Sequence, residues 1–297
     1  MTFSVFLQFL AFGVSLGATY ALIAIGYTIV YGVLGLINIA HGDFFMLAGF
    51  TAMWAVFKYH LPMPAAFFIG AVAVPVLGVI VERVAYRPLR DFKISAFTST
   101  VAVSFFLQST VIIFFTARAH AFPVPAFMEE VINIGGISIS RVTVFIIAVS
   151  AVMFLMLSFL VTKTKIGRAM RALSKDLEAT KLMGVNTDRV ISFAFALATL
   201  YAALAAFMWG FKFPTFDAYA GIIPGLKGFV GAVIGGIGSI PGALVGGFLL
   251  GLAEILLVAF FPSLSGWRDI FAYGLMIVFL LFRPGGIFDV RVREEKV

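Results

Sequence analysis

The sequence predicts an all-α integral membrane protein that crosses the bilayer several times. Of its 297 residues, 62% are hydrophobic and only 12% are charged, whereas soluble domains carry about 25% charged residues. The apolar residues come in long blocks, most of which can cross about 30 Å of hydrocarbon as a helix of about 20 residues. These blocks show no alternation of period two, which argues against a membrane β-barrel.

The apolar blocks, taken in order, justify the count of spans. They cover roughly residues 3–36, 44–57, 61–81, 94–117, 142–161, 190–211, 221–261 and 270–282. The first block fits one long or broken helix, and no Lys or Arg precedes it, so we expect a retained span. The glycine-rich block 221–261 must cross twice, or once with a broken or re-entrant piece. We therefore expect about eight to ten spans, nine being the simplest count, in one transmembrane domain over residues 1–297.

Positive charge is concentrated in the segments 82–93, 163–189 and 283–296, which together hold 15 of the 21 Lys and Arg residues. The positive-inside rule places these segments in the cytoplasm. We then expect the N-terminus outside, the C-terminus inside and the segment 118–141 outside. Topology alone accounts for the net charge of +7, so no nucleic-acid partner is needed. The absence of cysteine excludes disulfides and cysteine metal sites.

Residues 163–189 are expected to form a rigid projection on the cytoplasmic face. Ser174 is a candidate N-cap of a short helix over 175–183, and Gly184 is a candidate left-handed stop for it. Asn186, or the threonine after it, can cap the helix that re-enters the membrane. A plain tether between two spans is the alternative, but a tether needs neither two caps nor a glycine. A rigid, charged projection is suited to entering a groove on a partner and passing motion to the attached spans.

The same segment carries a family resemblance. "EATKLMG" (178–184) resembles the EAA loop of ABC importer permeases, with Thr in its third position and without the downstream Ile-x-Leu-Pro. "GRAMRALSKDLEATKLMGVN", "LINIAHGDFFMLAGF" and "GAVIGGIGSIPGALVGG" resemble the branched-chain amino acid permeases, and they are similar to the shorter, LivH-type of the two permease subunits. The resemblance covers nearly the whole chain.

This resemblance implies one subunit of an importer of branched-chain amino acids, or of related small amides or urea, working by ATP-driven alternating access in the bacterial inner membrane. The implied partners are a second, LivM-like permease, two cytoplasmic LivG/LivF-like ATPases, a periplasmic substrate-binding protein and membrane lipid. The chain has no Gly-Lys-Ser or Gly-Lys-Thr, so it lacks a phosphate loop. We expect no enzyme activity, catalytic residue, metal or cofactor in this chain, with ATP and Mg²⁺ used by the partner ATPases. The implied coupling residues are Arg171, Ser174, Asp176, Glu178, Ala179, Gly184 and Asn186.

A polar stretch interrupts the apolar residues near position 40. Asp43 is expected to cap a helix over 44–57, with Gly42 providing the sharp entry. The additional hypothesis is that this break lines the translocation pathway, with Asn38, His41 and Asp43 as candidates.

A second candidate part of the pathway lies in the glycine-rich block. Glycines four residues apart allow close approach of helix backbones, and Pro241 is expected to break the helix. A break exposes backbone polar groups, which are tolerated only against protein or a water-filled cavity. Glu254 is either a partner for a hydroxyl on a neighbouring helix or part of the pathway. The candidates here are Gly235, Gly236, Gly238, Pro241 and Glu254.

Two other classes of function remain open from the residues themselves. A membrane enzyme needs a nucleophile with a base, paired carboxylates or metal ligands, and His41 is the only histidine expected inside the membrane. An ion-coupled carrier or channel is the stronger alternative. It requires buried carboxylates, and Asp43 and Glu254 are the two that can serve.

Overall fold

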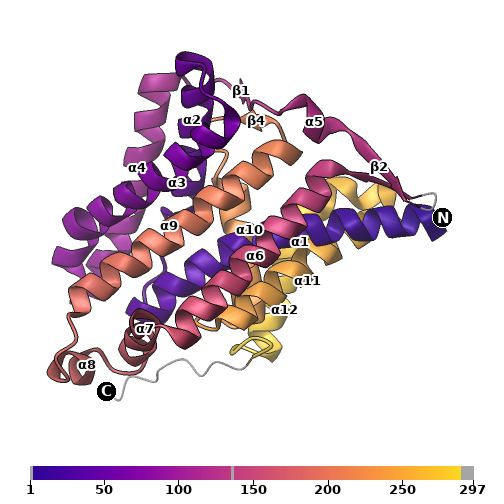
Figure 1. Cartoon of the computed structure of the whole chain (residues 1–297). Helices are drawn as coiled ribbons and strands as arrows, with labels where there is room; N and C mark the ends of the chain where they lie inside the picture. The colour runs from indigo at the N-terminus through magenta and orange to yellow at the C-terminus, as the bar shows by residue number, and fades with distance from the viewer. Residues whose placement is uncertain (1–2, 135–136, 289–297) are drawn as a thin grey trace.

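The computed structural model describes residues 3–134 and 137–288, and nearly all of them are helical. The helices are α1 (Phe3–Leu34), α2 (His41–Tyr59), α3 (Met63–Val81), α4 (Lys93–Phe115), α5 (Ala126–Glu129), α6 (Arg141–Lys163), α7 (Lys165–Lys175), α8 (Leu177–Leu182), α9 (Thr187–Lys212), α10 (Ile222–Gly235), α11 (Ile240–Phe260) and α12 (Arg268–Phe282) (Figure 1). The π-helical turn η1 (Glu82–Tyr86) and the 3₁₀ turn η2 (Arg87–Leu89) follow α3, and the 3₁₀ turn η3 (Pro262–Trp267) precedes α12. The strands form two antiparallel pairs, β1 (His120–Ala121) with β4 (Thr215–Phe216) and β2 (Val131–Ile134) with β3 (Ile137–Ser140).

The predicted class of all-α, multi-pass membrane protein is confirmed. In the described residues, seven helical stretches are long and apolar enough to cross a membrane: Phe3–Leu34, Met63–Leu89, Lys93–Phe115, Arg141–Lys163, Thr187–Lys212, Ile240–Phe260 and Pro262–Phe282. The remaining long helices are α2, which carries His41 and Asp43 and is less apolar, and the 14-residue α10. The first apolar block, expected as a long or broken helix, is one continuous helix of 32 residues.

The helices divide into a buried centre and an outer layer. Within the most apolar stretch of α1 and of α9, 72% of the residues are buried inside the protein, against 28% for α4 and 6% for the span Pro262–Phe282 formed by η3 and α12. The outer face of α4 exposes large apolar side chains, Phe105, Phe106, Ile113 and Phe114, as expected of a surface in contact with lipid. The polar groups described below therefore lie around the central helices.

The break between α1 and α2 turns the chain back into the protein. Gly35 has a positive φ of 65°, which glycine adopts without steric cost, and the chain then runs without helical structure to residue 40. His41 packs against Gly26 and against the ring of Tyr27, with ring centroids 4.5 Å apart and the ring planes tilted by 58°. Tyr27 lies about two turns before the end of α1. The break therefore delivers the start of α2 to the interior.

The predicted cap of this helix is wrong. The helix begins at His41, its N-cap is Ala40, and no side chain caps it. Asp43 is 3% exposed and lies within the first turn. Its carboxylate turns inward, where Oδ1 accepts a hydrogen bond of 2.9 Å from Gln108 on α4. An Asp43 side chain that capped its own helix could not make this contact.

The joint between α10 and α11 also differs from the prediction. Gly236 and Gly238 have φ values of 106° and 99°, so the glycines themselves end α10. Pro241 lies in the first turn of α11, where its missing N–H needs no partner. The helix is thus interrupted before Pro241. Gly242 then approaches the backbone of Gly235 across the joint so closely that neither position has space for a side chain.

The predicted close packing of glycines is confirmed between α1 and α11. A Cβ on Gly17 would lie 2.7 Å from the carbonyl oxygen of Phe248, and one on Gly247 would lie 2.5 Å from the backbone of Ala21. These glycines let the two helices pack at backbone distance, and such contacts replace hydrophobic driving force between helices in lipid.

Candidate functional site

The segment 163–189 folds as two short helices at one end of the helical bundle (Figure 1). The helix α7 places Met170 and Leu173 on one face, one turn apart, and both are buried. This packing continues α7 to Lys175, so Ser174 lies inside a helix and the prediction that it caps the next one is wrong. Its hydroxyl donates to the carbonyl of Arg171 in the same helix.

An N-cap and the predicted glycine stop flank α8, with the cap two residues later than expected. Asp176 is the N-cap, and its Oδ1 accepts a hydrogen bond of 3.0 Å from the backbone N–H of Ala179. Gly184 has a φ of 80°, which confirms the left-handed stop. Asn186 caps α9 by accepting a 3.1 Å hydrogen bond from the N–H of Arg189. The segment is therefore fixed at both ends of α8.

The end of α8 exposes two large apolar side chains. Leu182 and Met183 are 87% and 83% exposed, next to the exposed Glu178 and Lys181. Exposed apolar residues on a charged, rigid projection are typical of a surface that a partner protein covers.

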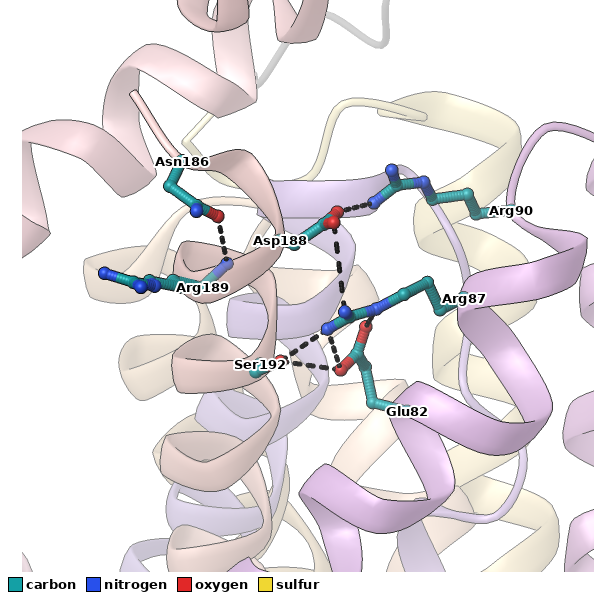
Figure 2. A network of polar contacts seen from close by, with 7 residues as sticks. All are labelled: Glu82, Arg87, Arg90, Asn186, Asp188, Arg189 and Ser192. Atoms are coloured by element: carbon teal, nitrogen blue, oxygen red, sulfur yellow. Dashed lines mark hydrogen bonds and ion pairs between the residues drawn. The ribbon is translucent and has the colours of Figure 1, made fainter. Parts of the chain in front are cut away.

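A network of charged side chains lies at the start of α9, where this segment ends. Figure 2 shows Glu82 in contact with Arg87 from the following turn, η2, and with Ser192 from α9. Glu82 is 1% exposed. Its Oε1 accepts from Nε of Arg87 at 3.1 Å, and its Oε2 accepts from Nη2 of Arg87 at 3.0 Å and from the Ser192 hydroxyl at 2.7 Å. The buried carboxylate is thus fully bonded, as a buried charge requires.

The outer part of the network fastens the first turn of α9. Asp188 accepts a hydrogen bond of 2.6 Å from Nη1 of Arg90 and lies 3.8 Å from Nη1 of Arg87 (Figure 2). The two arginines belong to the turns that connect α3 with α4. The end of the 163–189 segment is therefore tied to the α3–α4 connection by a charge-assisted hydrogen bond, which is stronger than a neutral one.

A second polar group surrounds the start of α2. Gln108 joins Asp43 to Ser104, with a 3.1 Å hydrogen bond to the Ser104 hydroxyl. The Tyr86 hydroxyl donates to Oδ1 of Asn38 at 3.1 Å. Asn38 Nδ2 and both ring nitrogens of His41 have no hydrogen-bond partner among the described residues, although both residues are buried. Unused donors and acceptors in a membrane interior mark a functional position, since each one costs free energy.

A third polar group joins α10, α11 and α12 to α1. Oε2 of Glu254 accepts from the Tyr20 hydroxyl at 3.2 Å and from Nζ of Lys227 at 3.0 Å. Lys227 also contacts Asp269 at 2.7 Å. The other carboxylate oxygen of Glu254, Oε1, has no partner among the residues that the structure describes. The expectation that a hydroxyl on a neighbouring helix pairs with Glu254 therefore holds, and a lysine is added to it.

Comparison with known proteins places the chain in a family. Residues 9–280 match the family described as branched-chain amino acid transport system, permease component. The chain belongs to this family. It is 38% identical to the high-affinity branched-chain amino acid permease BraD of Pseudomonas aeruginosa over 98% of both chains, and 38% identical to LivH of Escherichia coli over 99% of both. A probable branched-chain amino acid permease, LivH, of Methanocaldococcus jannaschii is 25% identical over 93% of this chain and 90% of its own.

The predicted site residues of this permease fall into separate places. Those of the 163–189 segment lie together, and Asn38, His41 and Asp43 lie together at the start of α2. Glu254 belongs to the group with Lys227 and Tyr20. The glycines and Pro241 form the α10–α11 joint. This permease component is a transport subunit by family, and the matched family does not favour the ion-coupled carrier as an alternative.

Sequence reasoning named none of the residues that bond Glu82, Asp43 and Glu254, although it expected a hydroxyl partner for Glu254. Lys227 stands alone between apolar residues and glycines in "GLKGF", and a lone charge in an apolar block is the signal that could have found it. Glu82 and Arg87 were counted only as part of a basic loop. Their pairing was visible in principle, because residues five positions apart can meet where the helix is widened by a π-turn.

Proposed function

We propose that this permease is a subunit of an ATP-driven importer that moves branched-chain amino acids, or closely related small amides, into the cytoplasm. The full-length similarity to two permeases named for branched-chain amino acid transport supports the substrate class. The membrane is the bacterial inner membrane. The positive-inside rule supports an external N-terminus and a cytoplasmic C-terminus.

The proposed assembly contains four kinds of partner. These are a second, LivM-like permease, two LivG/LivF-like ATP-binding subunits in the cytoplasm, a periplasmic substrate-binding protein and the surrounding lipid. The permease itself binds no cofactor in this proposal, and its partner ATPases use ATP and Mg²⁺.

The segment 163–189, here called the coupling segment, is the contact with the ATPases. The observation that carries this proposal is a doubly capped helix, α8, whose exposed tip is joined by one short turn to α9, a central buried helix. Closure of the ATPase pair on ATP moves α8, and α9 passes that movement into the bundle. Arg171, Glu178 and Ala179 lie on the exposed surface of the segment, where they can contact an ATPase.

The substrate path runs beside the two helix joints in this proposal. Asn38, His41 and Asp43 offer polar groups at the break between α1 and α2, and the unpaired ring of His41 is the group best placed to respond to a passing solute. Replacing His41 by Ala with normal assembly but lost uptake supports this role. Loss of assembly together with uptake supports a structural role instead.

A single substitution at the tip of α8 tests the function. Leu182→Asp is expected to abolish co-purification of the ATPases in detergent and ATP-driven uptake of labelled leucine by proteoliposomes containing the complete transporter. Leu264→Asp is the matched control, because Leu264 is 38% exposed in η3 and is expected on the external side. It should leave ATPase binding unchanged.

Three results contradict the proposal. One is ATPase binding that survives Leu182→Asp, and another is ATPase loss caused equally by Leu264→Asp. The third is uptake of leucine by the isolated permease on an ion gradient alone, which supports the ion-coupled carrier.

A further inference from the structure

Two sets of polar contacts, joined by the backbone of the turn η1, connect the base of the coupling segment with the break between α1 and α2. They begin at Asp188 in the first turn of α9 and pass through Arg87 and Glu82 in the turns after α3 (Figure 2). The same π-helical turn η1 carries Tyr86, whose hydroxyl reaches Asn38 in the break. Elements far apart in the sequence are thus linked in one chain of contacts.

The first half of this chain, Glu82, Arg87, Ser192 and Asp188, is called the clasp. Arg87 is bound to both oxygens of Glu82, and Ser192 bridges them from α9. Because Glu82 is 1% exposed, moving α9 away from η1 would take the Ser192 hydroxyl from a buried carboxylate and Asp188 from Arg87, at a cost in free energy. The start of α9 and the turn η1 therefore move together.

The second half of this chain of contacts, from Tyr86 to Asn38, can pass a movement of η1 to the break between α1 and α2. A π-turn carries one extra residue compared with an α-helix, and such turns occur mostly at functional sites. Tyr86 is 2% exposed and packs against Phe195 on α9, with ring centroids 5.5 Å apart. Its hydroxyl contacts Asn38, which lies in the non-helical stretch between α1 and α2. A short irregular stretch yields more easily than a helix.

We propose that the clasp and Tyr86 carry the movement of the coupling segment to the break between α1 and α2, so that ATPase closure repositions Asn38 and the start of α2. Tyr86 acts as a positioning residue through Asn38. This inference rests on the proposed function, since it requires a partner that moves α8.

The chain has no cysteine, so one introduced thiol reports on the break. Ile39→Cys is suited to this, because Ile39 is 38% exposed in the break. The rate of maleimide labelling of this chain is measured in the complete transporter, with no nucleotide and after trapping with ATP and vanadate. We expect the rate to change on trapping. Tyr86→Phe should reduce that change by about two- to thirtyfold, which corresponds to the coupling free energies of about 0.5–2 kcal/mol described for such residues.

Tyr201→Phe is the matched control. Tyr201 is buried to 1% exposure on α9 and also donates one hydrogen bond, of 2.6 Å to the carbonyl of Met153, but it is not part of the chain of contacts. It should leave the trapping-dependent change intact. A structural role for Tyr86 predicts that both variants behave alike.

Two outcomes overturn the inference, namely labelling that is insensitive to trapping in the Ile39→Cys protein and an undiminished response in Tyr86→Phe. Leucine uptake per ATP hydrolysed is measured on the same preparations. Because labelling needs no substrate, a transporter that responds to trapping but takes up no branched-chain amino acid contradicts the proposed substrate and leaves the coupling route supported.

Discussion

Glu82 and Glu254 are both buried glutamates in the helical bundle, each 1% exposed and each paired with a cation. Glu82 has both oxygens bonded and lies where the chain returns from the coupling segment. Glu254 has one oxygen bonded to Tyr20 and Lys227 and the other without a partner among the described residues. Lys227 in turn reaches the half-exposed Asp269.

The difference separates two uses of a buried charge. The Glu82 group joins α9 to the turns after α3, and these two elements are proposed to move together. The Glu254 group holds α10, α11 and α12 against α1, where glycines already bring the backbones together. We infer that loss of the Glu254 group mainly lowers stability, whereas loss of the Glu82 group also impairs coupling.

The largest effect is expected from Lys227→Met. Removing the cation leaves Glu254 buried and unpaired, at a cost of about 3–5 kcal/mol. Thermal unfolding of the purified permease in detergent measures it. Adding Glu254→Gln should recover most of the loss. Arg141→Met breaks the exposed pair with Glu130 and should cost less than about 1 kcal/mol. Equal losses in Lys227→Met and Arg141→Met would show that the Glu254 group is not a stabilising centre.

The next effect tests the Glu82 side of the comparison through Arg87→Lys. Lysine keeps the charge but cannot bind both oxygens of Glu82 and Ser192 in one plane. The loss of hydrogen bonds to a charged group should cost about 1.5–3 kcal/mol of stability. Leucine uptake per ATP should fall in protein that still assembles. A fall in thermal stability without any change in that ratio would make the two glutamate groups equivalent.

The glycine contact on the Glu254 side is tested by Gly247→Ala. The added methyl group would meet the backbone of Ala21 at 2.5 Å, and such overpacking typically costs about 1–3 kcal/mol. Gly274→Ala is the control, since nothing lies within 4 Å of a Cβ there. Thermal unfolding should separate the two variants, and similar stabilities would mean that α1 and α11 separate easily.

The smallest effect is expected in the coupling segment. Asp176→Ala removes the cap of α8 and should cost about 1 kcal/mol, seen as weaker ATPase binding in a titration of the detergent complex. Ser174→Ala removes a hydroxyl that caps nothing and should bind normally. Weaker ATPase binding by Ser174→Ala than by Asp176→Ala would show that Ser174 caps the helix, as the sequence predicts.

The features predicted from sequence are those that depend on neighbouring residues. Membrane helices were visible because hydropathy accumulates over about 20 residues, and Gly184 and Asn186 because stops and caps use local chemistry. The start of α8 was missed, because Ser174 and Asp176 are about equally good caps and only the packing of Leu173 decides between them.

The side-chain partners could not be predicted, because they are distant in the chain. Gln108 reaches Asp43 across 65 positions, and Arg87 reaches Ser192 across 105. A single sequence carries no record of such distances. The local capping prediction for Asp43 therefore failed where a distant amide proved the better partner.

The central claim is that the clasp and the Tyr86–Asn38 contact act in series. A double-mutant cycle on leucine uptake per ATP hydrolysed tests it most directly, with Asp188→Asn at one end of the chain of contacts and Tyr86→Phe at the other. The effects of two substitutions at independent, distant sites add. If the two contacts act in series, the losses do not add, and the double variant has the same uptake per ATP as the poorer single variant. Additive losses from the two substitutions would contradict the account.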